Sequence, residues 1–175
     1  MPSPIGHALG GAIVSLMMAP KGPGSWVLGL EKYASTIVVL AAVAPDVDFA
    51  WGGHNRETHS LGAAIIAGLV VYAWKRNQRL AIAVALSWAS HVLFDWLGSD
   101  DTPPLGVMAL WPINSNFYFA NAFVFEAISR RYWLDNFFTH NAWAVTREVL
   151  ILGPLAWMVW WFGRRSKAPK ERRGR

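Results

Sequence analysis

The chain of 175 residues contains no cysteine, which excludes a disulfide framework and a thiolate metal site. Any bound metal must therefore be held by histidine, carboxylate or water. Charged residues are also scarce, at 15%, against about 25% in a typical soluble domain. By contrast, 54% of the residues are hydrophobic and eleven are tryptophan, a residue enriched where a bilayer meets water. The composition therefore indicates a membrane protein.

Lysine and arginine are absent before Lys21, which argues against a cleaved signal peptide. They are concentrated in the last twelve positions, which hold seven of the sixteen basic residues. One interpretation of this tail is nucleic-acid binding. We favour a cytoplasmic tail facing anionic lipid, because it directly follows an apolar segment. We therefore expect one membrane-embedded domain at residues 1–163, a disordered tail at 164–175, and no nucleic-acid partner.

Five apolar segments predict helices, at about residues 5–19, 33–45, 59–74, 79–98 and 146–163. All but the fourth are short against the roughly 20 residues that a perpendicular span needs. The mixed run from Gly98 to about Trp143 predicts interfacial loops and one amphipathic helix near 120–131. The expected fold is all-α: a membrane-embedded helical bundle of about five apolar helices, with a long interfacial connection before the last helix.

Charge predicts how these segments are oriented in the membrane. If all five cross, the connections 20–32 and 75–78 and the basic tail lie on one side, which the positive-inside rule makes cytoplasmic. The opposite side is net acidic, and most of the histidine and aspartate residues lie there. We therefore expect a multi-pass inner-membrane protein with one convergent site towards the extracytoplasmic face. This expectation fails if one segment does not cross.

His91 and Asp95 are spaced four residues apart, so a helix places both side chains on one face. One interpretation is a hydrogen-bonded pair that joins two helices. We favour a metal-ligand pair, because ionisable groups are costly in an apolar segment and other histidines are available.

Two further motifs offer ligands. Asp46 and Asp48 follow Pro45. In an extended backbone both carboxylates would point to one face and could bind one metal. A turn that ends the preceding helix is an equally good interpretation of the same residues. His54 and His59 precede the third segment, which Thr58 or Ser60 could cap. The alternative for both histidines is a plain polar loop, and Arg56 between them is free to bind an anionic group.

Several single residues remain open. His7 is either a ligand or a surface histidine near the start of the chain. Asp100 and Asp101 are ligands, a general base or turn residues. Glu148 is a ligand, a base or an ordinary interfacial carboxylate, and His140 has no partner at an informative spacing.

Taken in order, the motifs resemble those of the LexA-binding, inner-membrane-associated family of metal-dependent hydrolases. They are Gly6-His7, Pro45 to Asp48, His54 to Ser60, Ser90 to Asp95, and Leu110-Trp111-Pro112. That family is distantly similar to zinc-dependent phospholipase C, which implies phosphoester or lipid hydrolysis. The resemblance implies these metal-site residues: His7, Asp46, Asp48, His54, His59, His91 and Asp95. The connection between Asp95 and Trp111 is longer than the family's usual one, so the substrate loop departs from the pattern.

The expected function is a membrane-bound, metal-dependent hydrolase that holds one or two zinc ions. A metal-activated water would attack the substrate, Asp48 or Asp100 would take its proton, and Arg56 would hold an anionic group. The expected partners are membrane lipid and a small-molecule or lipid-linked substrate. The alternative is a non-catalytic membrane protein with a structural metal site or a metal or proton transport role. We favour an enzyme because the ionisable residues cluster at segment ends, whereas transporters place them at mid-bilayer.

Overall fold

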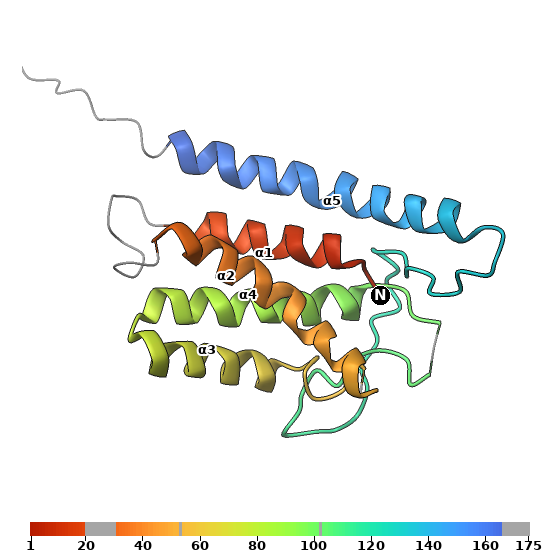
Figure 1. Ribbon diagram of the computed structural model, residues 1–175, viewed down its shortest axis with the longest axis horizontal. Coiled ribbons are helices and arrows are strands. Elements are labelled where there is room, and N and C mark those ends of the chain that lie inside the picture. Colours follow the sequence, from red (N-terminus) through yellow and green to blue (C-terminus); the bar gives the residue numbers. More distant parts are fainter. Residues whose placement is uncertain (20–30, 53, 102, 166–175) are drawn as a thin grey trace, which may run out of the picture.

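The computed structural model describes residues 1–19, 31–52, 54–101 and 103–165 (Figure 1). Within these residues the chain forms five α-helices and one 3-10 helix, and no strand. The elements are α1 (Pro4–Met18), α2 (Glu31–Val43), η1 (Ala44–Trp51), α3 (Leu61–Lys75), α4 (Gln78–Leu97) and α5 (Phe137–Arg165). The prediction of an all-α bundle of five apolar helices is therefore confirmed.

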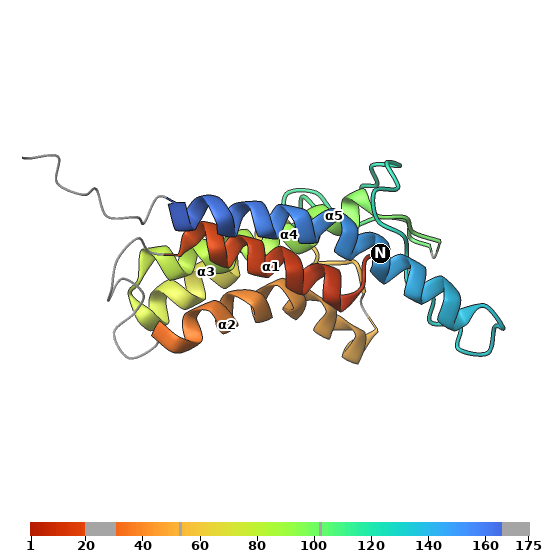
Figure 2. The ribbon, with the colours of Figure 1, turned by 90° about the horizontal axis from the view of Figure 1, so that it is seen from above.

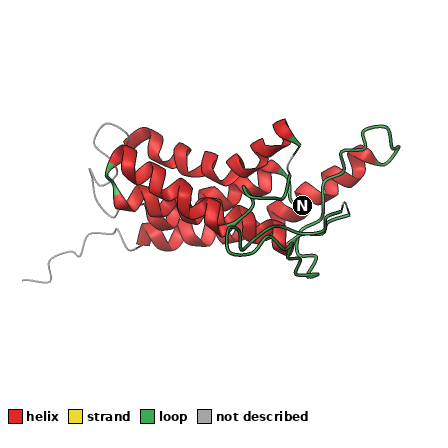
Figure 3. Ribbon diagram, turned by 90° about the horizontal axis from the view of Figure 1, so that it is seen from below, coloured by secondary structure: helices red, strands yellow, loops and turns green. Residues whose placement is uncertain are grey.

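Successive helices run in opposite directions along one long axis (Figure 1). One end of the bundle, which we call the loop end, carries residues 1–3, 44–52, 54–60, 98–101 and 103–136. Figures 2 and 3 show these loops gathered there, beside the start of α5. The turn between α3 and α4 and the last turn of α5 lie at the opposite end. The fold thus contains the alternation of helix directions on which the predicted membrane orientation depends.

Local sequence signals fix three helix starts. The Ser3 and Ser60 hydroxyls accept hydrogen bonds from Gly6 N (3.2 Å) and Ala63 N (3.0 Å) at the starts of α1 and α3. The Asn77 side chain accepts from Leu80 N at 2.8 Å at the start of α4. These caps satisfy amide groups that have no partner within the helix. The expectation that Thr58 or Ser60 caps the third helix is confirmed for Ser60.

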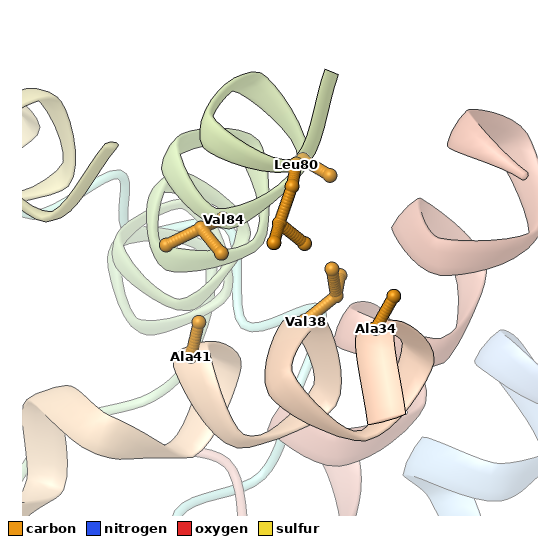
Figure 4. Close-up of a cluster of buried hydrophobic side chains, with 6 residues drawn as sticks. Ala34, Val38, Ala41, Leu80 and Val84 are labelled. Atoms are coloured by element: carbon orange, nitrogen blue, oxygen red, sulfur yellow. The ribbon is translucent and has the colours of Figure 1, made fainter. Parts of the chain in front are cut away.

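The helices pack closely through small and branched side chains. Figure 4 shows one buried cluster between α2 and α4, which consists of Ala34, Val38, Ala41, Leu80, Val84 and Ala83. On α1, Gly11 faces the same pair of helices, and a Cβ there would lie 2.8 Å from the Ala42 Cβ. Small residues at such crossings let apolar helices approach in lipid, where hydrophobic burial gives no driving force.

The outer surface of the bundle is apolar. Large exposed hydrophobic side chains continue along α3 and α5, including Ile65, Leu69, Trp74, Leu150, Trp157 and Phe162. Among the described residues, three helical stretches are long and apolar enough to cross a membrane: Tyr33–Ala50, Gln78–Leu97 and Phe137–Gly163. The helices Pro4–Met18 and Leu61–Lys75 are shorter. A surface of this kind suits lipid better than water.

Two expectations about the long connection are wrong. Residues 120–131 form no helix, because their backbone pairs with the end of α4: Val124 N donates to Leu97 O, and Ser99 N donates to Phe125 O. In addition, α5 begins at Phe137 rather than near 146. Its first turns carry polar residues whose side chains bond to the adjoining loop, as Asn141 does with Ser129. An apolar pattern alone could not detect such turns.

The predictions for the connection 20–32 and the tail 164–175 lie outside what the structure describes. Residues 20–30 and 166–175 are not described, and neither are the side chains at 31, 32, 164 and 165.

Candidate metal centre

Four of the five histidines and three aspartates meet at the loop end. His7 lies on α1, Asp46 and Asp48 on η1, His54 and His59 in the loop before α3, and His91 and Asp95 on α4. The side chains of His7, His59 and His91 have no solvent exposure, and Asp48 and Asp95 have 1%. His54 and Asp46 keep 17% and 20%. The structure therefore brings together all seven residues that the sequence suggested as metal-site residues.

Asp95 lies at the centre of the group. Its Oδ2 is 3.0 Å from His91 Nε2 and 3.5 Å from His59 Nε2, and its Oδ1 is 3.3 Å from His7 Nε2. Asp46 Oδ1 closes the other side, at 3.6 Å from His59 Nε2 and 3.7 Å from His91 Nε2. The i, i+4 spacing of His91 and Asp95 brings their side chains together as predicted.

Three overlapping triads have donor atoms within 4.8 Å of one another, which is close enough to share an ion. They are His7–Asp46–His91, Asp46–His54–His59, and His59–His91–Asp95. The Nε2 atoms of all four histidines and both Asp95 oxygens are buried without a hydrogen-bond partner. Buried polar atoms without partners are costly, and each usually has a structural or ligand-binding explanation. A divalent cation would satisfy several of these atoms at once, so the donor set fits a metal.

The opposite ring nitrogens are held by the surrounding chain. His91 Nδ1 contacts the Ala42 carbonyl at 2.7 Å, which requires Nδ1 to donate, and its Nε2 points to Asp95. His59 Nδ1 lies 3.1 Å from Asp48 Oδ2 and 3.0 Å from Thr58 Oγ1. Metal-binding histidines commonly donate their second N–H to a carboxylate or carbonyl in this way.

Asp48 occupies a different position from Asp46. Its Oδ1 is 3.1 Å from His54 Nδ1, and its Oδ2 accepts a hydrogen bond from Thr58 Oγ1 at 2.7 Å. It belongs to none of the three triads. The extended backbone considered for this motif is wrong, because residues 44–51 form a 3-10 helix that begins at Ala44, with Pro45 in its first turn. With three residues per turn, side chains two apart point in different directions.

The carboxylates keep His59 charged in the metal-free protein. Burial alone lowers the pKa of its imidazole, but the adjacent carboxylates of Asp46, Asp48 and Asp95 raise that pKa to about 9. A metal that binds Nε2 must displace this proton.

A cavity of about 300 Å³ opens beside the centre. Its lining includes Asp46, Phe49, His54, Asp100, Asp101, Arg130 and Arg131. Asp100 is thus near the triads, with its Oδ2 accepting from Gly106 N at 2.9 Å. Arg56 is exposed and does not line the cavity. Sequence reasoning did not place Phe49 or the two arginines on this cavity, although a basic pair in an otherwise acidic connection was a usable signal.

Glu148 lies outside the triads. Ser3 N donates to its Oε1 at 2.6 Å, and the Ser3 hydroxyl bonds its other oxygen. This fully buried carboxylate therefore joins α5 to the start of α1. His140 is also remote from the centre, with Nε2 at 2.8 Å from the Ala127 carbonyl.

Comparison with known proteins yields one family match. The model of the YdjM inner membrane protein family matches residues 1–166, which include every helix and every candidate ligand. Curated proteins and solved structures give no match. The match agrees with the inner-membrane association that the motifs suggested, and the similarities to LexA binding and to phospholipase C remain predictions.

Proposed function

The chain belongs to the YdjM inner membrane protein family, and from this membership and the buried centre we propose that it is a membrane-bound, metal-dependent hydrolase. One observation carries the proposal: six buried donor atoms without hydrogen-bond partners, on His7, His54, His59, His91 and Asp95, converge beside an open cavity. Imidazole nitrogen and carboxylate oxygen together suit zinc, and the overlapping triads offer room for one ion or two.

In this proposal each residue has a distinct task. His59, His91 and Asp95 hold one ion, and Asp46 with His7 or His54 completes that site or holds a second. When bound, the metal lowers the pKa of a water to about 7 and polarises the scissile bond. Asp48 orients His54 and His59 through its hydrogen bonds. Asp100, on the cavity wall, accepts a proton during hydrolysis of a phosphoester or lipid-linked substrate.

We further propose a multi-pass topology with the loop end on the extracytoplasmic face. The opposite end carries Lys75 and Arg76 at the turn between α3 and α4, which the positive-inside rule assigns to the cytoplasm. The metal centre then opens at a membrane surface, where both water and lipid headgroups are available.

A second candidate function is a non-catalytic membrane protein with a structural metal site or a metal or proton transport role. The observation in its favour is the complete burial of His7, His59 and His91. Against it, Asp46 and His54 both line the cavity and are partly exposed, so a ligand could reach them.

The test is the metal content of the full-length, detergent-purified protein by elemental analysis. Wild type is compared with His91→Ala, Asp95→Ala and the matched control His140→Ala, which removes the one histidine outside the centre. We expect a near-stoichiometric transition metal in wild type and control, and its loss from the other two. A wild type without metal after reconstitution with zinc and manganese contradicts the proposal. Bound metal without hydrolysis of any phosphodiester or lipid tested favours the second candidate.

A further inference from the structure

An arginine faces the cavity without a carboxylate partner. Arg130 lies on the cavity wall, and its Cζ is 4.0 Å from the centre of the Phe49 ring. The next residue, Arg131, is paired with Asp101 at 3.7 Å. Within the described part of the chain, no carboxylate forms an ion pair with Arg130. Arg130 therefore offers a ligand in the cavity a positive charge that no carboxylate pairs with.

Aromatic stacking connects this arginine to the proposed metal centre. The Phe49 ring stacks on the His54 ring, with centroids 3.7 Å apart and planes 26° apart. His54 in turn belongs to a triad with Asp46 and His59. Cation–π attraction to the Phe49 ring restrains the position of the Arg130 guanidinium, whose N–H groups can serve a bidentate acceptor.

We propose that Arg130 binds a phosphodiester group of the substrate in this cavity. The proposal rests on the proposed hydrolase function and names its substrate class. Asp46, Asp100 and Asp101 also line the cavity, so only one guanidinium is available among several carboxylates. A phosphodiester carries one negative charge, which a single guanidinium neutralises, whereas a phosphate monoester carries nearly two at neutral pH. Arginine matches such oxygens through paired hydrogen bonds.

The size and the remaining lining fit the same ligand. About 300 Å³ is at the lower end of small-molecule pockets, which is room for a headgroup but not for long acyl chains. Pro4, Pro104 and Ile128 supply apolar walls for the ester substituents. Arg56, the sequence-based candidate for anion binding, is absent from this lining.

The experiment measures the binding of dibutyl phosphate and butyl phosphate to the zinc-loaded, full-length protein by titration calorimetry. Wild type is compared with Arg130→Gln, Arg130→Lys, Arg56→Gln and Arg79→Gln. Arg79 is exposed on the first turn of α4 at the opposite end, so Arg79→Gln removes the same charge away from the cavity. We expect Arg130→Gln to weaken diester binding about tenfold or more, because a charge-assisted hydrogen-bond pair is lost. Arg130→Lys should retain part of the affinity, and Arg56→Gln and Arg79→Gln all of it.

A second arm uses dihexanoylphosphatidylglycerol below its micelle-forming concentration. Tighter binding than dibutyl phosphate, with the same dependence on Arg130, supports the proposal with a lipid as the source of the phosphodiester. Weaker binding with that dependence supports it with a soluble diester.

Three results overturn the inference: unchanged diester affinity in Arg130→Gln, loss of affinity in Arg56→Gln instead, or tighter binding of butyl phosphate. Zinc content measured on the same samples shows that each variant retains its fold and its metal centre. It also separates the two proposals. Protein that cannot be loaded with zinc but binds dibutyl phosphate through Arg130 contradicts only the hydrolase proposal. Zinc-loaded protein that binds the diester equally in wild type and Arg130→Gln contradicts only this inference.

Discussion

The geometry of the candidate metal centre depends on what holds each histidine ring in place. His59 and His91 each direct Nε2 to Asp95 while the surrounding chain holds Nδ1. A histidine near a carboxylate can adopt many geometries, but a hydrogen bond at Nδ1 restricts the direction in which Nε2 points. The preorganisation of the centre therefore depends on residues that contact ligands as well as on the ligands themselves.

Asp48→Asn tests this dependence. The amide retains the size of the side chain but loses the charge that holds His54 and His59, so we expect zinc affinity to fall about 10- to 100-fold without complete loss of metal. The measurement is zinc titration against a competing chelator. Glu57→Gln is the matched control, because its side chain is exposed on the same loop. Equal affinities in wild type and Asp48→Asn would contradict an orienting role.

Proton release tests the state of His59. Its pKa of about 9 means that the metal-free imidazole is protonated at pH 7, and zinc requires the neutral nitrogen. Zinc affinity should therefore rise with pH, by about tenfold per pH unit for this proton, and level off above pH 9. Calorimetry in buffers of different ionisation enthalpy counts the released protons. An affinity that stays constant between pH 7 and pH 9 would contradict the idea that zinc displaces a proton from His59.

At the scale of elements, the centre is formed by segments that are distant in the chain but adjacent in the bundle. α1, η1, the loop before α3, and α4 each contribute one or two donors. Their close approach depends on small residues at the crossings, and Gly11 contacts both α2 and α4: a Cβ there would lie 2.9 Å from Val39 Cα and 3.1 Å from Ser87 Oγ.

Gly11→Ala should therefore destabilise the bundle by about 1–3 kcal/mol, the usual range for overpacking a close contact. Gly153→Ala is the control, because the new Cβ would meet only Val149 Cγ1 at 3.9 Å. The measurement is thermal unfolding in detergent, followed by circular dichroism. A melting temperature for Gly11→Ala equal to that of the control would mean that α1 can shift without cost.

At the scale of the whole molecule, the apolar exterior and the polar loop end are separate regions. The long helices expose leucine, valine and tryptophan along their lengths, whereas the ionisable residues collect where the helices end. An enzyme acting at a membrane surface needs this separation, because its ligands must reach water while its helices remain in lipid.

The absence of cysteine makes the proposed topology directly testable. Glu57→Cys lies at the loop end and Gln78→Cys at the opposite end, and both native side chains are exposed. We expect a membrane-impermeant maleimide to label Glu57→Cys in intact spheroplasts, and Gln78→Cys only after lysis. Labelling of both cysteines in intact spheroplasts would mean that the helices between these sites do not cross. The reverse pattern would place the metal centre in the cytoplasm.

The sequence by itself determined the helices and the ligand types. Apolar runs and caps are local features, so four of the five helices and the role of Ser60 follow from short stretches of chain. The lack of cysteine likewise excluded thiolate ligands. The i, i+4 spacing of His91 and Asp95 predicted that both side chains lie on one helix face, without any knowledge of how the helices pack. The start of α5 was missed because its polar residues are satisfied by a loop that the local pattern does not show.

Tertiary structure alone decided which residues meet. It placed Asp46 in the triads and Asp48 behind them, because a 3-10 turn separates side chains that an extended strand would align. It also brought Arg130 onto Phe49 across a long stretch of sequence and left Arg56 outside the cavity. Contacts between distant segments depend on how the helices pack, and packing geometry is not encoded in the spacing of residues within one segment.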